Sequence, residues 1–181
     1  MRTWVQEHPK PNGEQYNIFE DGLKIFVTID SRMQKYAEEA IDEHMSNLQQ
    51  YFFEEQKNNK TAPFYELEEV QVDEILERAK KNSGRYKRLN NIGKSSKYIE
   101  EVFNKKTKME VFSHKGMIDT IMSPYDSIRY YKYFLRSGLL SIEPQTGHVK
   151  AWVGGIDYKN FKFDAVAQQK RQVGSTFKPF V

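Results

Sequence analysis

The chain has 181 residues, of which 38% are hydrophobic, 14% aromatic and 29% charged, with a formal net charge of +3. These values suit one compact unit with appendages and exclude a largely disordered chain. The small positive surplus does not indicate a nucleic-acid-binding protein. The chain has no cysteine, which excludes disulfides and thiolate metal sites. No apolar run approaches the roughly 20 residues of a membrane helix, so we expect a soluble chain.

The first third of the sequence predicts a linker, a strand and a long helix. Two prolines and a glycine in "EHPKPNGEQ" (7–15) favour an extended linker, which we assign to residues 1–21. "LKIFVTID" (23–30) alternates apolar and polar residues with the period of a strand. From Ser31 to Phe53 apolar residues then recur every three or four positions, and Ser31 followed by Gln34 fits a capping box.

The middle third gives weaker patterns. After a break at 56–63, we predict a helix from Val70 to Lys81, shorter helical pieces at 86–89 and 96–103, and a hairpin whose turn contains Lys115 and Gly116. Residues 78–97 hold eight basic and no acidic side chains, namely Arg78, Lys80, Lys81, Arg85, Lys87, Arg88, Lys94 and Lys97. Such a run is either a solvated helix face or a surface that contacts an anionic membrane or polyanion.

The last third has clear signals for the ends of its helix and for a turn. "SPYDSIRYYKYFLRSG" predicts a helix from Pro124 to Arg136, with Ser123 as its cap and Gly138 after its end. Two alternating runs joined by "PQTG" predict an antiparallel hairpin over 139–153. Together these elements predict an α+β fold in which helices pack on a small antiparallel sheet.

Ser175 and Lys178 in "RQVGSTFKPFV" (171–181) are the candidate catalytic residues. Three residues apart, they share a face if a helix begins near Ser175. A serine becomes nucleophilic when a neighbouring base takes its proton, and a lysine can do this when apolar surroundings such as Phe177 and Phe180 lower its pKa. The alternative is a capped, solvated helix start, because Ser-x-x-Lys alone is a weak signal.

The histidines and the remaining aromatic residues favour structural roles over binding or catalysis. The four histidines, His8, His44, His114 and His148, are scattered without ligand spacing, so we expect surface or helix-face histidines and neither a metal site nor a cofactor. Trp152 and the aromatic residues of "RYYKYF" have helix or strand spacing, which favours core packing over carbohydrate stacking.

With the hairpin ahead of it, "RQVGSTFKPF" resembles the start of the transpeptidase domain of class A penicillin-binding proteins, the bifunctional peptidoglycan synthases. "GLKIFVTIDSRMQKYAEEAI" is similar to the segment that opens this domain, and "SPYDSIRYYKYFL" resembles the form found in Bacteroidetes-type bacteria. The resemblance implies that Ser175 is the acylated nucleophile and Lys178 its general base. It also implies peptidoglycan stem peptides and β-lactams as partners, and a parent protein at the extracytoplasmic, periplasmic face of the cell membrane.

The resemblance divides the chain into a linker (1–21), the first strand and long helix of the transpeptidase domain (22–56), a mostly helical insertion (57–122) and a C-terminal part with the start of the catalytic helix (123–181). The Ser-x-Asn and Lys-Thr-Gly motifs of the family do not occur in the 181 residues. We therefore expect a fragment that is inactive by itself, from a parent that cross-links stem peptides and polymerises glycan strands. The alternative is a non-catalytic module whose insertion docks to a cell-wall protein or an anionic membrane surface.

Overall fold

The computed structural model describes the backbone of residues 2–180, and within this range every side chain except those of Arg2, Thr176 and Phe180. Helices and two separate two-stranded antiparallel sheets make up the described chain, which confirms the α+β prediction. The elements are α1 (Arg2–Glu7), α2 (Ser31–Glu55), α3 (Glu69–Asn82), α4 (Gly84–Asn91), α5 (Ser96–Asn104), β1 (Thr107–Ser113), β2 (Gly116–Met122), α6 (Pro124–Lys132), β3 (Leu139–Ile142), β4 (Val149–Val153), α7 (Ala165–Gln168) and the 3₁₀ helix η1 (Gly174–Phe180).

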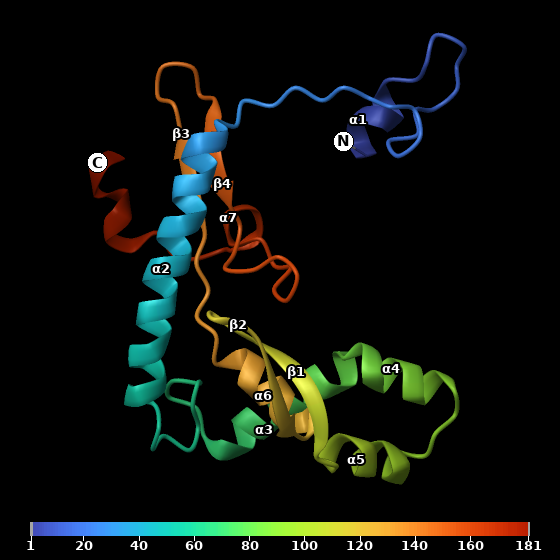
Figure 1. The fold of residues 1–181 in the computed structure, drawn as a ribbon, viewed down its shortest axis with the longest axis vertical. Helices are drawn as coiled ribbons and strands as arrows, with labels where there is room; N and C mark the ends of the chain where they lie inside the picture. Colours follow the sequence, from blue (N-terminus) through green and yellow to red (C-terminus); the bar gives the residue numbers. More distant parts are fainter. Residues whose placement is uncertain (1, 181) are drawn as a thin grey trace.

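The long helix α2 runs along one side of the molecule and joins its two parts (Figure 1). In the upper part of this view, β3, β4 and α7 lie beside the N-terminal half of α2. In the lower part, the β1–β2 hairpin lies among α3, α4, α5 and α6. Helix α1 stands apart, and an extended stretch of chain connects it to α2.

Each part has its own core. The upper core consists of Ala37, Ile41 and Met45 of α2 with Ala151 and Val153 of β4. The aromatic cluster below it contains Phe112, Phe134 and Phe161, whose ring centroids lie 5.1 to 5.6 Å apart. Ile156 packs against both clusters, so the loop after β4 links the two parts.

Helix α2 confirms the prediction from Ser31 to Phe53 and extends to Glu55. Its cap differs from the prediction, because the N-cap is Asp30 rather than Ser31. The Asp30 carboxylate accepts hydrogen bonds from the amides of Arg32 and Met33, at 2.9 and 3.1 Å. A negative charge at this position also complements the helix dipole.

Helix α6 has the predicted cap, Ser123, which forms a capping box with Asp126, but the helix ends at Lys132, four residues before Arg136. The reason is Gln49 of α2, whose side chain is 2% exposed. Its amide nitrogen donates to the carbonyl of Tyr133 at 3.0 Å, and its amide oxygen accepts from the N–H of Leu135 at 2.8 Å. These bonds satisfy backbone groups of the irregular segment that follows α6, so this segment needs no further helical turn.

The strand predicted over 23–30 is wrong: this segment is extended but pairs with no strand. Only its end approaches the sheet, where the hydroxyl of Thr28 donates to Val149 O at 2.8 Å and the N–H of Asp30 donates to Lys150 O at 2.9 Å. Ile25 and Phe26 are 57% and 92% exposed. The alternating pattern was present, but a strand forms only where a neighbouring strand satisfies its backbone groups. The short helix α1 within the expected linker was not predicted.

The middle third forms the predicted helices, slightly extended as α3, α4 and α5, and the predicted β1–β2 hairpin. At the hairpin turn, Ser113 is paired with Gly116, whose φ of 106° favours glycine. Lys80 departs from the expected basic surface, because it is only 1% exposed. Its Nζ lies 3.1 Å from the Glu77 carboxylate and 2.5 Å from that of Glu100. Burial lowers the pKa of Lys80, but these hydrogen bonds outweigh it and hold the pKa above its usual value.

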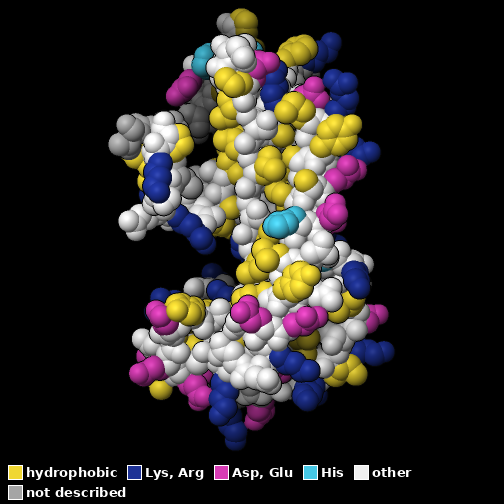
Figure 2. Space-filling model, turned by 90° about the vertical axis from the view of Figure 1, so that its left-hand side faces the viewer, with side chains coloured by type: hydrophobic (Ala, Val, Ile, Leu, Met, Phe, Trp, Pro, Cys, Tyr) yellow, Lys and Arg dark blue, Asp and Glu magenta, His cyan; other side chains and the backbone are white. Residues whose placement is uncertain are grey.

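The space-filling view shows a narrowing between the upper and lower parts, with hydrophobic side chains gathered along the upper part (Figure 2). Tyr36, Leu48 and Tyr51 of α2 are among the exposed apolar residues, at 65%, 42% and 71%. Of the helices in residues 2–180, none combines the length and apolar character needed to cross a membrane.

Candidate functional site

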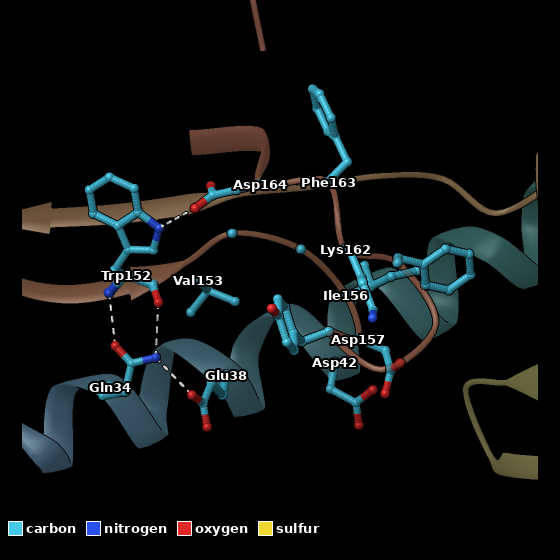
Figure 3. Close-up of a pocket in the computed structure, with 14 residues that line it drawn as sticks. Gln34, Glu38, Asp42, Trp152, Val153, Ile156, Asp157, Lys162, Phe163 and Asp164 are labelled. Atoms are coloured by element: carbon cyan, nitrogen blue, oxygen red, sulfur yellow. Dashed lines mark hydrogen bonds between the residues drawn. The ribbon is translucent and has the colours of Figure 1, made fainter. Parts of the chain in front are cut away.

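Helix α2 holds the outer edge of β4 through a side-chain amide. The Oε1 atom of Gln34 accepts from the N–H of Trp152 at 2.8 Å, and its Nε2 donates to the carbonyl of the same residue at 3.0 Å (Figure 3). One glutamine thereby makes both hydrogen bonds that a neighbouring strand would make at this position. The strand that leads toward Ser175 is thus fixed to the longest helix of the molecule.

Asp164 fixes the loop that follows β4. Its Oδ2 accepts from the indole N–H of Trp152 at 3.0 Å, and its Oδ1 caps α7 by accepting from the amides of Val166 and Ala167. The hydrogen bond from the Ala167 amide is the main reason why the pKa of Asp164 lies below its usual value. A Cβ at Gly154 would lie 2.7 Å from this carboxyl, so any larger residue there would displace Asp164 from its hydrogen bonds.

A cavity of about 520 Å³ lies between α2 and this loop (Figure 3). Its walls combine four carboxylates with aromatic rings, from Glu38, Asp42, Asp157 and Asp164 and from Trp152, Tyr158, Phe161 and Phe163. Three of the carboxylates already accept hydrogen bonds within the protein: Glu38 from Gln34, Asp157 from Asn160, and Asp164 from Trp152. These hydrogen bonds therefore tie the loop to its own residues and to β4, and hold Glu38 against α2, around the cavity.

The candidate nucleophile lies outside this cavity, on η1. Ser175 and Lys178 are both exposed, and neither lines the cavity. In a 3₁₀ helix, residues three apart eclipse one another, so the two residues share one side of η1. Gly174, directly before the serine, has a φ of 53° in the left-handed region, which favours glycine.

The apolar setting expected for Lys178 is not built by the described side chains. Phe177 is 52% exposed, and the side chain of Phe180 lies outside the described residues. No hydrogen bond joins Ser175 to Lys178, although both side chains belong to the described part. The arrangement brings the serine and the lysine onto one short helix but leaves both in solvent. It supplies a nucleophile and a potential base without an enclosed pocket.

His114 differs from the surface histidine expected from the sequence, because its side chain is only 6% exposed. It lies against the rings of Phe112 and Phe134, at centroid distances of 5.5 and 5.9 Å. Both ring nitrogens are buried without a hydrogen-bond partner, and Nδ1 lies 3.8 Å from a carboxylate oxygen of Asp42.

Within residues 2–180, no group of three potential ligands could hold a metal ion.

Comparison with known proteins finds one matching protein family and several similar proteins. Residues 59–135 match the family model described as penicillin-binding protein middle domain. Over 192 aligned residues, the chain is 27% identical to penicillin-binding protein 1A of Neisseria flavescens, which covers 91% of this chain and 23% of that protein. Both comparisons thus find similarity to penicillin-binding proteins.

A further relative is penicillin-binding protein 1A of Escherichia coli strain K12, which is 51% identical over 47 residues, 26% of this chain and 6% of that protein. The chain thus spans about a quarter of the Neisseria flavescens relative at most. No solved structure matches the chain. The family assignment made from the sequence is confirmed, whereas the Bacteroidetes-type origin stays a prediction. The matched middle domain overlaps most of the segment expected to be an insertion, 57–122.

Gln49 and Asp164 were not singled out from the sequence, and Gln34 was expected only in a capping box with Ser31, whereas its side chain bonds Trp152 and Glu38. One of them left a signal, because Gln49 follows Ala37, Ile41 and Met45 at steps of four along the buried face of α2. A polar residue in such a register indicates a buried hydrogen-bonding role.

Proposed function

We propose that this chain carries the acylation segment of a bifunctional peptidoglycan synthase that acts in cell-wall biosynthesis. Ser175 is the nucleophile and Lys178 its general base. The Oγ atom of Ser175 attacks the penultimate D-alanine carbonyl of a stem pentapeptide, Lys178 takes the hydroxyl proton, and the terminal D-alanine leaves with a proton. The acyl group then passes to an amine on a neighbouring strand, which regenerates the serine. Penicillins would acylate the same oxygen.

The observation that carries the proposal is the placement of Ser175 and Lys178 on one side of η1, directly after a loop fixed by Trp152 and Asp164. The left-handed Gly174 turns the chain into η1 just ahead of the serine. Similarity to penicillin-binding proteins supports the same roles. The division into 1–21, 22–56, 57–122 and 123–181, and the periplasmic location of the parent, are parts of this proposal.

By itself the 181-residue chain is inactive in this proposal. Ser175 and Lys178 are both exposed, so no enclosed site holds an acyl donor and its developing oxyanion against the serine. Reaction with a fluorescent penicillin tests this by gel fluorescence. We expect no label on the 181-residue chain, and label on a chain that continues to the Ser-x-Asn and Lys-Thr-Gly motifs.

In the longer chain, Ser175→Ala and Lys178→Ala should each abolish labelling, while Ser137→Ala, which alters a serine outside the site, should leave it unchanged. Labelling that survives Ser175→Ala would refute the assignment of the nucleophile.

A further inference from the structure

The lower part of the molecule carries a surface of unpaired positive charge. Seven of the eight basic residues between 78 and 97 are exposed; they are Arg78, Lys81, Arg85, Lys87, Arg88, Lys94 and Lys97. We call these seven residues the cationic surface. The eighth basic residue, Lys80, is buried and pairs with Glu77 and Glu100. Seven of the eight basic residues between 78 and 97 are therefore available at the surface, and one is buried in ion pairs.

None of the seven side chains makes an ion pair with a described carboxylate, although acidic residues are plentiful nearby in sequence. Glu77 and Glu100, the nearest acidic residues in the chain, are both engaged by Lys80. Lys94 instead lies over the ring of Tyr98, 5.1 Å from its centroid. Lys80 thus pairs with the two nearest carboxylates, and the seven exposed cations have no ion-pair partner among the described carboxylates.

Five residues of the cationic surface belong to α4, α5 and the turn between them, namely Arg85, Lys87, Arg88, Lys94 and Lys97. Helices α4 and α5 and the turn between them project away from α2 (Figure 1). Within that turn Ile92 is 62% exposed, next to Gly93 and two residues before Lys94. The turn therefore presents one exposed apolar side chain close in sequence to Arg88 and Lys94.

We propose that the cationic surface binds the anionic lipid headgroups of a membrane. Clustered Lys and Arg side chains are attracted to the negative potential of such a surface without a fitted pocket. Among residues 78–98, Ile92 and Tyr98 are the large apolar side chains that are exposed, and Tyr98 already lies beneath Lys94. A protein interface of ordinary strength has several buried aromatic anchors, which this surface does not offer. A surface with one exposed isoleucine and several exposed cations therefore suits anionic lipid headgroups better than a protein partner. This inference is independent of the acyl-transfer chemistry.

Co-sedimentation of the 181-residue chain with vesicles tests the proposal. We expect binding to vesicles of phosphatidylglycerol and phosphatidylethanolamine, and none to vesicles of phosphatidylcholine alone. Binding should weaken strongly between about 0.01 M and about 0.15 M salt, because the screening length falls from about 30 Å to about 8 Å.

A matched pair of triple variants separates the surface from the net charge. Lys81→Glu, Lys87→Glu and Lys94→Glu together should weaken binding at least about tenfold. The control combines Lys24→Glu, Lys57→Glu and Lys159→Glu, three exposed lysines elsewhere that change the net charge equally, and it should retain most of the binding. Circular dichroism should show that both variants fold like the original chain.

Three results would overturn the proposal. One is no sedimentation with anionic vesicles at low salt, and another is equal loss of binding in the two triple variants. The third is binding to polyglutamate without binding to anionic vesicles, which would identify an acidic protein as the partner. None of these results bears on penicillin labelling of Ser175, so failure here leaves the proposed function standing.

Discussion

Gln49→Leu should destabilise the protein although it replaces a polar residue in a core with an apolar one of similar size. The side chain of Gln49 is 2% exposed and makes two hydrogen bonds to the segment after α6, with Tyr133 O and Leu135 N. Leucine fills the space but leaves both backbone groups without a partner. Each unsatisfied buried group costs about 1–3 kcal/mol, and both sites are only partly buried, so we expect a loss of about 2 kcal/mol.

For a chain of this size that loss corresponds to a decrease in Tm of about 4–8 °C. Thermal and urea unfolding followed by far-UV circular dichroism would measure it. Gln50→Leu is the matched control, because Gln50 is exposed and its contact with Glu54 is 3.4 Å long. The control should change stability by no more than about 0.5 kcal/mol. Equal stability of Gln49→Leu and the original chain would refute the role of Gln49 as the group that ends α6.

Two further predictions concern charged groups. Hydrogen bonds from the amides of Met33 and Arg32 hold the folded-state pKa of Asp30 below its usual value, so its stabilising effect is present above the unfolded pKa and is lost as pH falls through the folded pKa. Asp30→Asn should therefore be less stable than the original chain near neutral pH, and the difference should shrink below about pH 4, as urea titrations at several pH values would show. Lys80→Met should cost about 2 kcal/mol in urea unfolding, because it removes the charge-assisted hydrogen bonds from the buried ammonium to the half-exposed carboxylates of Glu77 and Glu100. Lys81→Met, at an exposed position, should cost almost nothing, and equal effects of the two substitutions would speak against the ion pairs of Lys80.

Elements whose signals are local were predictable from the sequence. Pro124 after Ser123 fixed the start of α6, and a glycine at 116 fixed the turn of the β1–β2 hairpin. The period of α2 also gave its extent. That period did not give the buried face in detail: Tyr36 and Leu48 fit the apolar pattern yet are exposed, while Gln49 is buried. Which side of a helix meets the core depends on partners that lie far away in sequence.

Features that depend on distant partners were missed or wrong. The segment 23–30 has the alternation of a strand, but it lies beside β4 only at its end, so tertiary context overrides the pattern. The end of α6 depends on Gln49, which is 84 residues away from Tyr133. In the candidate site, the placement of Ser175 and Lys178 on one side of η1 followed from their spacing, whereas their exposure and the Gln34 and Asp164 contacts required the structure.

Peptide mapping after penicillin treatment tests the central claim most directly. A chain that continues beyond Val181 to the missing motifs would be acylated, digested with trypsin and examined by mass spectrometry. Trypsin cuts after Arg171 but not between Lys178 and Pro179, so one peptide beginning at Gln172 contains both candidate residues. We predict that this peptide carries the penicilloyl adduct, that fragmentation places it on Ser175, and that Ser175→Ala removes it. An adduct on any other residue, or an unmodified Gln172 peptide in a chain that is otherwise acylated, would contradict the account.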